Sequence, residues 1–234
     1  MYDGLGNEII LDTGWSGKII GIIGDSFTAL GTWSQEMGDN LGATIISKAM
    51  SGTGFANQAL KSAYKQAQEF VTTYANPDAF IIAMGTNDNN TTIDDIVDVN
   101  SVSAMTAEQI GTFTGGMQAC ILYLQEHYPN ARILLGWTPA NGYWSSGTYA
   151  EYTTKMDAHV AKMKEVAEWY GVEYIETRPC GFTRKNTIYA DYWGSDNHPN
   201  AKGHHKIAQY MTMLMKSLGG YTEVQEDVSN SQNT

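Results

Sequence analysis

The amino-acid sequence predicts an α/β fold in which helices cover both faces of a parallel sheet. Short apolar runs alternate along the chain with longer amphipathic segments, and this alternation is typical of strand-helix-strand units. The chain has 234 residues and 42% hydrophobic content, enough to bury a full core. A single α/β domain of this length is common, so one domain is expected.

Five strands and five main helices are expected, in alternating order. Each strand is a short apolar run that ends at polar or glycine residues, and each helix is a longer segment with apolar residues at helical spacing. The expected strands are residues 18–24, 43–47, 79–84, 131–136 and 172–176. The expected helices lie near residues 28–41, 56–75, 107–128, 150–170 and 200–217.

The expected domain covers residues 18–218. Residues 1–17 are expected to form a linker or a small hairpin, and their acidic start lacks the basic and apolar regions of a signal peptide. Residues 219–234 are rich in Ser, Asn, Gln and acidic residues, which indicates a poorly ordered tail or a linker. We interpret the chain as a module of a larger extracellular or phage-borne protein.

A serine follows the first apolar strand directly. Ser26 comes after Gly24 and Asp25, at the point where a helix should begin. The carboxyl edge of a parallel sheet is where ligands bind in open α/β folds, and a helix start directs unpaired N–H groups at any negative charge that forms there. Ser26 is therefore a candidate nucleophile, and Asp25 is expected to have a structural or hydrogen-bonding role beside it.

Three further blocks follow in a fixed order: residues 51–54 (SGTG) after the second strand, residues 85–88 (GTND) after the third, and residues 196–200 (DNHPN) before the last helix. Together with the GDS at residues 24–26, this pattern resembles the SGNH superfamily of hydrolases, also called GDSL-type esterases and lipases. The joint pattern is far more specific than any one block. The resemblance implies a flavodoxin-like, three-layer α/β/α sandwich with a five-stranded parallel sheet.

By this resemblance Ser26 is the nucleophile, His198 is the general base, and Gly52 and Asn87 complete an oxyanion hole. Elementary chemistry requires the same residue types. Imidazole has the pKa that suits removal of the serine proton at neutral pH. A tetrahedral oxyanion needs fixed donors, which the Ser26 N–H, the Gly52 N–H and the Asn87 amide would supply.

The chain departs from the family pattern at the acid that orients the histidine. In the family this aspartate usually stands three residues before the histidine, where this chain has Ser195. We predict that Asp196 takes the role. Two alternatives stay open: the Ser195 carbonyl could accept the imidazole N–H in a Ser-His dyad, or Asp191 could serve.

Each block also has a purely structural interpretation. Ser26 could cap a helix, Gly52 and Gly54 could permit a turn, Asn87 could belong to a turn, and His198 could be an exposed loop residue. All of these would have to hold together to explain the order of the blocks, so we favour the catalytic interpretation.

The composition restricts the partners. The 14 Lys and Arg residues against 25 Asp and Glu give a net charge of −11, which disfavours nucleic acid and anionic membranes. No phosphate-binding or dinucleotide-binding glycine motif occurs, so no cofactor is expected. His198, His204 and His205 lack a recognisable metal-ligand spacing, so no metal is expected. The two cysteines, Cys120 and Cys180, are too few for a disulfide framework.

Aromatic residues are the evidence in the sequence on the kind of substrate. Trp137, Trp144 and Trp193 fall in segments expected near Ser26, where rigid rings could offer flat faces to a sugar or an acyl chain, although buried rings could equally be core. No long apolar lid is visible. We predict an esterase that removes short acyl groups, acetyl above all, from a carbohydrate. The alternatives are a lysophospholipase or thioesterase, a non-catalytic carbohydrate-binding module, or a flavodoxin-like domain that binds phosphate.

Overall fold

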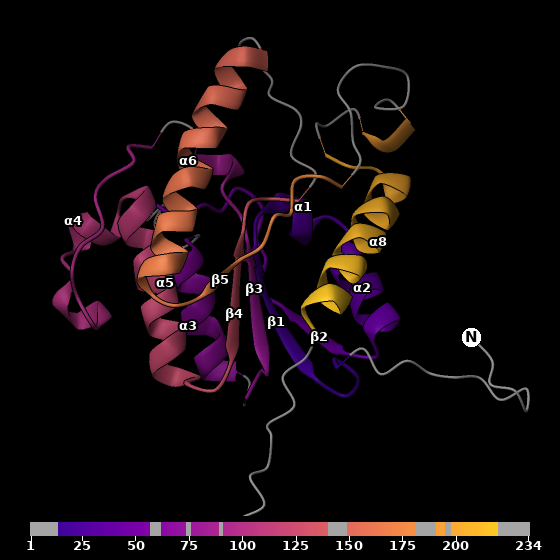
Figure 1. Ribbon diagram of the computed structural model, residues 1–234, viewed down its shortest axis with the longest axis horizontal. Coiled ribbons are helices and arrows are strands. Elements are labelled where there is room, and N and C mark those ends of the chain that lie inside the picture. Colours follow the sequence, from indigo (N-terminus) through magenta and orange to yellow (C-terminus); the bar gives the residue numbers. More distant parts are fainter. Residues whose placement is uncertain are drawn as a thin grey trace, which may run out of the picture.

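A computed structural model describes residues 14–56, 62–73, 76–88, 91–139, 149–180, 191–194 and 198–219, without the side chains of residues 149–155. In this part of the chain a five-stranded parallel sheet lies between two layers of helices (Figure 1). The α/β/α sandwich predicted from the sequence is confirmed.

Every strand lies within its expected range. The strands are β1 (Ile19–Gly24), β2 (Thr44–Ser47), β3 (Ala79–Ala83), β4 (Arg132–Gly136) and β5 (Glu173–Tyr174). They are ordered β2-β1-β3-β4-β5 across the sheet. The chain therefore crosses from one side of β1 to the other after β2. A binding crevice is expected where the strand order reverses, at the carboxyl ends of β1 and β3.

The helices are more broken than the sequence pattern indicates. They are α1 (Ser26–Ala29), α2 (Trp33–Leu41), α3 (Ala63–Thr73), α4 (Ala107–Ile110), α5 (Phe113–His127), α6 (Tyr149–Trp169) and α8 (Ala201–Leu218), with short 3₁₀ turns η1 (Thr86–Asp88) and η2 (Val102–Ala104). The single helix expected over residues 107–128 is two, because Gly111 ends α4 and the Thr112 hydroxyl caps α5 by accepting from Gly115 N–H.

The helix expected over residues 28–41 is also two, since α1 ends at Ala29 and α2 starts at Trp33. The helix expected over 56–75 begins only at Ala63 among the described residues. The N–H groups of Phe55 and Ala56 bond instead to a side-chain carboxylate, that of Asp88. Within the described ranges, no helix combines the length and the apolar character needed to cross a bilayer.

The two faces of the sheet are covered by separate apolar layers. Helices α3, α5 and α6 pack on one face and α2 and α8 on the other (Figure 1). Along β3, Phe80 and Ile82 belong to the first layer and Ile81 to the second, as the two-residue period of a strand requires. Close packing on both faces makes the sheet a rigid base for residues that follow its carboxyl ends.

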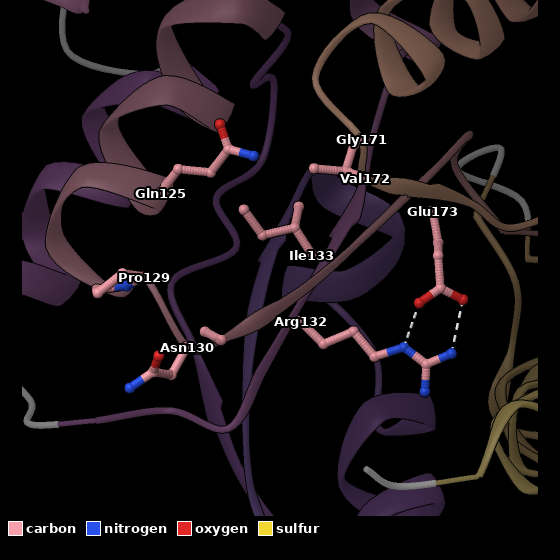
Figure 2. A pocket seen from close by; sticks show the side chains of 9 residues that line it. Gln125, Pro129, Asn130, Arg132, Ile133, Gly171, Val172 and Glu173 are labelled. Atoms are coloured by element: carbon pink, nitrogen blue, oxygen red, sulfur yellow. Dashed lines mark hydrogen bonds and ion pairs between the residues drawn. The ribbon is translucent and has the colours of Figure 1, made fainter. Parts of the chain in front are cut away.

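A cavity lies at the opposite edge, by the amino ends of β4 and β5 (Figure 2). Gln125, Arg132 and Glu173 are among its lining residues. The Arg132 guanidinium donates to both carboxylate oxygens of Glu173 and to the Gly219 carbonyl at 2.6 Å. These charged groups thus tie β4, β5 and the end of α8 together, and none of the predicted site residues lines this cavity.

Candidate active site

Ser26 is the first residue of α1, directly after β1. The helix is capped by Asp25, whose carboxylate accepts from the Phe27 N–H at 3.0 Å. The Asp25 carbonyl accepts from the N–H of Ala29 at 2.9 Å. The capping role considered for Ser26 therefore belongs to Asp25, and the serine hydroxyl is not needed to hold the helix.

The Ser26 hydroxyl instead meets a histidine from the other end of the chain. Ser26 Oγ lies 2.9 Å from His198 Nε2, across a sequence separation of 172 residues. Ser26 is 9% exposed and His198 is partly buried, so the serine is largely shielded from water and the histidine is less so. A nucleophile and a general base need this distance for proton transfer.

Backbone bonds and aromatic contacts hold His198 in place. Its carbonyl accepts from the Gly194 N–H at 2.7 Å, and its ring lies 5.4 Å from that of Phe27. Next to it, Pro199 forms an antiparallel bridge with Trp193. His198 is thus held between the segment 191–194 and Phe27, the residue that follows Ser26.

The residue that orients His198 stays a prediction. Asp196 and Ser195 lie outside the described residues. Asp191 has an exposed side chain, and its carbonyl accepts from Asn200 Nδ2 at 2.9 Å.

Two backbone N–H groups predicted for the oxyanion hole are available. Gly52 has φ +74° in a turn closed by a bond from Thr53 N–H to the Met50 carbonyl at 3.3 Å. Glycine suits this position because other residues rarely adopt such a φ. Within the described part of the chain, neither the Ser26 N–H nor the Gly52 N–H has a hydrogen-bond partner.

The third predicted donor, the Asn87 amide, uses one of its two N–H bonds within the protein. Asn87 lies in η1, and its Nδ2 donates to the Thr53 carbonyl at 2.8 Å. A primary amide has two N–H bonds, and among the described residues the second has no partner. The contact to Thr53 fixes the rotamer of Asn87 and leaves one donor for a ligand.

Two buried acids lie behind these groups. Burial raises the pKa of Asp25 to about 7, although the Thr138 hydroxyl donates to its carboxylate. Burial likewise raises the pKa of Asp88 to about 6, although it accepts from the Phe55 and Ala56 N–H groups. A carboxylate removed from water resists ionisation even when it accepts hydrogen bonds.

The sequence pattern did not single out Thr138 or the contacts of the Asp88 carboxylate. Thr138 is buried just beyond β4, and its Oγ1 also accepts from the Thr86 N–H at 3.4 Å. In the sequence, the one indication of a role for Thr138 and Asp88 was their position, two and five residues after the ends of apolar strands. Position indicates the site edge but not which side chain a residue will contact.

The three tryptophans expected around the substrate have different surroundings. Trp137 is 1% exposed and packs against His159, so its ring belongs to the core and does not form an open wall. Trp193 is 7% exposed and its ring lies 5.7 Å from that of Phe27, so it packs against the turn that carries Ser26. Trp144 lies outside the described residues.

His204 and His205, the two histidines that follow His198, make contacts that serve the fold. His204 is buried in α8, and burial lowers its pKa, which favours a neutral ring. The exposed His205 contacts the Glu36 carboxylate. In the ranges that the structure describes, no three His, Cys, Asp or Glu side chains are grouped as a metal ion would need.

The family model of the GDSL-like lipase/acylhydrolase family matches residues 22–206, which contain all four sequence blocks. The chain belongs to this family. It is a carboxylic ester hydrolase, as the SGNH resemblance implied. No curated protein matches this hydrolase significantly in sequence.

Solved structures share the fold of this GDSL-family hydrolase. A protein from Lactobacillus plantarum is 20% identical with a TM-score of 0.64, covering 86% of this chain and 98% of its own. A catalytic mutant of an acetylxylan esterase from Geobacillus stearothermophilus is 19% identical with a TM-score of 0.59, over 86% and 95% of the two chains. A carbohydrate acetylesterase from Sinorhizobium meliloti is 17% identical with a TM-score of 0.57, over 86% and 99%.

Proposed function

We propose that this hydrolase removes short acyl groups, acetyl groups above all, from carbohydrate esters through an acyl-enzyme intermediate. The observation that carries the proposal is the 2.9 Å contact between Ser26 Oγ and His198 Nε2 at the carboxyl edge of the sheet. The substrate class is supported by the acetylxylan esterase and the carbohydrate acetylesterase among the structures of the same fold.

The geometry supports a two-step reaction. His198 Nε2 takes the proton of the Ser26 hydroxyl while Oγ forms a bond to the ester carbonyl carbon. The carbonyl oxygen becomes an oxyanion, stabilised by the Ser26 and Gly52 N–H groups and the second N–H of Asn87. As the oxyanion collapses, the bond from the carbonyl carbon to the alcohol oxygen breaks, and the protonated His198 gives its proton to that oxygen. In the second step His198 Nε2 takes a proton from water while the water oxygen bonds to the acyl carbon. The bond from that carbon to Ser26 Oγ then breaks, the acid leaves, and His198 returns the proton to Oγ.

The charge of the chain fits a neutral substrate. At a net charge of −11, a polyanion or an anionic membrane is repelled, whereas a neutral sugar ester is not. We therefore propose a small-molecule or glycan ester as the partner, and neither nucleic acid nor a membrane. The chemistry assigned to Ser26 and His198 requires no cofactor.

The first experiment compares the wild type with Ser26→Ala on p-nitrophenyl acetate and on acetylated polysaccharides. The alanine variant removes the attacking oxygen, so kcat should fall by about 10⁴-fold or more while the protein stays folded. Ser34→Ala is the matched control, since Ser34 is also a buried helix serine, and it should keep its turnover. An active Ser26→Ala would show that another group is the nucleophile.

A chain-length series then tests the substrate class. With p-nitrophenyl esters from acetyl to dodecanoyl, kcat/KM should be highest at acetyl, and acetate should be released from acetylated xylan. A maximum at long chains would favour the lysophospholipase alternative, and a preference for acyl thioesters would favour a thioesterase. Glycan binding without any turnover would favour a non-catalytic module.

A further inference from the structure

Two of the three proposed oxyanion donors lie on two segments that hydrogen bonds join at several points. One is the loop of residues 52–56, here called the donor loop, which contributes the Gly52 N–H. The other is η1, which contributes Asn87. Asp88, the last residue of η1, is fully buried and has no part in the proton transfers of the proposed mechanism.

The Asp88 carboxylate holds the donor loop with both of its oxygens. Oδ2 accepts from the Phe55 N–H at 2.8 Å and Oδ1 from the Ala56 N–H at 3.0 Å. The neighbouring Asn87 amide bonds to the Thr53 carbonyl of the same loop. Hydrogen bonds from N–H groups to a carboxylate are stronger than those to a neutral acceptor, so the Asp88 contacts are the firmest link between the two segments.

The donor loop packs tightly against the Asp88 carboxylate. A Cβ added at Gly54 would lie 2.5 Å from Asp88 Oδ1, so the loop backbone presses directly on the carboxylate. On the other side of Asp88, its carbonyl oxygen lies 3.1 Å from His159 Nε2 and accepts from the Thr91 hydroxyl. His159 of α6 and Thr91 therefore hold the backbone of Asp88 in place. The Asp88 carboxylate in turn holds the donor loop.

We infer that Asp88 is a positioning residue that sets the spacing between the Gly52 N–H and the Asn87 amide. The inference rests on the proposed function, because it assumes that these two groups bind the oxyanion. The consequence is specific: a change at Asp88 should affect stabilisation of the transition state more than binding of the substrate, because the donor spacing matters most when the negative charge has formed.

The test is Asp88→Asn, which keeps the size of the side chain. An amide offers one acceptor oxygen and one NH₂ group, so one of the two loop N–H groups would face a donor and the loop would shift. A misplacement of about 1 Å in a catalytic group costs about 10²-fold in rate. We expect kcat on p-nitrophenyl acetate to fall by about 10- to 100-fold, with KM changed by less than about threefold.

A matched control exists at the opposite edge of the sheet. Asp78 also accepts from a backbone N–H, that of Ile19 at 2.8 Å, and from Lys18 Nζ at 3.0 Å. Asp78→Asn makes the same chemical change far from Ser26 and should keep kcat. Phenylboronic acid adds a readout that needs no turnover, since its adduct with Ser26 puts an oxygen where the oxyanion forms. Its affinity should fall in Asp88→Asn by a factor similar to the loss in kcat.

Gly54→Ala keeps the inference testable if Asp88→Asn does not fold. Its added Cβ pushes on the same carboxylate, so it should also lower kcat more than it raises KM, and the double variant should lose little beyond the worse single variant. A folded Asp88→Asn or Gly54→Ala with kcat within about twofold of the wild type overturns the inference. Equal losses in Asp78→Asn also overturn it, whereas activity in Ser26→Ala refutes the proposed function itself.

Discussion

The two halves of the candidate site are held by different kinds of contact. On the oxyanion side, the donor loop and η1 are joined through buried side chains, the Asp88 carboxylate and the Asn87 amide. On the histidine side, the segment around His198 is held by backbone bonds and aromatic packing.

Because of this difference, we expect the two halves of the site to respond to different kinds of substitution. Buried polar contacts are directional and costly to leave unpaired, so the oxyanion side should respond strongly to changes that keep size but alter hydrogen bonding. Backbone bonds do not depend on side-chain identity, so the histidine side should respond mainly at His198 and its orienting partner. The predictions below test this contrast, from the largest expected effect to the smallest.

Asp196→Asn should have the largest effect of these, because it removes the charge predicted to orient the imidazole and stabilise its protonated form. In a comparable triad this change costs about 10⁴-fold in kcat. We expect kcat to fall by at least about a hundredfold with KM little changed, measured on p-nitrophenyl acetate.

Asp191→Asn serves as the comparison for Asp196→Asn. If it shows the larger loss, Asp191 is the orienting acid. If both variants turn over normally, the Ser195 carbonyl becomes the preferred partner of His198, and the histidine side is held by backbone contacts throughout.

Asn87→Ala should have the next largest effect. Loss of one oxyanion donor typically lowers kcat by about 10²–10³-fold, and this variant also removes the bond to the Thr53 carbonyl. KM should change little, because the lost interaction forms mainly in the transition state. The control is Asn40→Ala, since the Asn40 amide links α2 to α8 through Thr212 at 3.4 Å. A kcat close to normal in Asn87→Ala would remove it from the oxyanion hole.

The fold was predictable because its signals are local. The three central strands are apolar runs, such as Ile19–Gly24 and Ala79–Ala83, and their burial on both faces requires that composition whatever the neighbours. Helix ends were less predictable. The late start of α3 at Ala63 goes with bonds from the Phe55 and Ala56 N–H groups to the distant Asp88 carboxylate, which no local pattern contains.

The candidate site was predictable in its residue types and less so in its supports. Ser26 and His198 are each found by a short motif, and the structure brings them together. The cap at Asp25 is a local contact, whereas the bond from Thr138 to Asp25 and the core position of Trp137 depend on packing between segments far apart in the sequence. A sequence indicates that an aromatic ring follows a strand, but only packing decides whether it turns inward.

Asp25→Asn should change the free energy of unfolding, and the size of that change should depend on pH. Burial raises the pKa of Asp25 from 3.8 to about 7, with a smaller contribution from the nearby Asp88 charge. Because the folded state holds this proton more tightly than the unfolded chain, the associated stability is present below about pH 4 and lost as the pH rises to about 7. Asn cannot titrate, and its amide can satisfy both Phe27 and Thr138.

The measurement is the free energy of unfolding in denaturant from about pH 4 to pH 8. At about 1.4 kcal/mol per pKa unit, Asp25→Asn should exceed the wild type at pH 8 by on the order of 2–4 kcal/mol, and the gap should close at low pH. An unchanged pH slope would show that Asp25 ionises normally and that its burial costs no stability.

Asn200→Ala should give the smallest effect, and it tests the histidine side through a contact that is not made by the backbone alone. The Asn200 side chain caps α8 by accepting from the Gly203 N–H at 3.1 Å, and its amide donates to the Asp191 carbonyl. Losing an N-cap costs about 1 kcal/mol. If backbone bonds are enough to hold His198, kcat should stay within about threefold of the wild type. The control is Thr106→Ala, which removes the cap of α4 on the other layer and should cost similar stability with no change in kcat. A loss of kcat in Asn200→Ala as large as that in Asn87→Ala would mean that the histidine side also depends on buried side-chain contacts, and the contrast between the two halves would not stand.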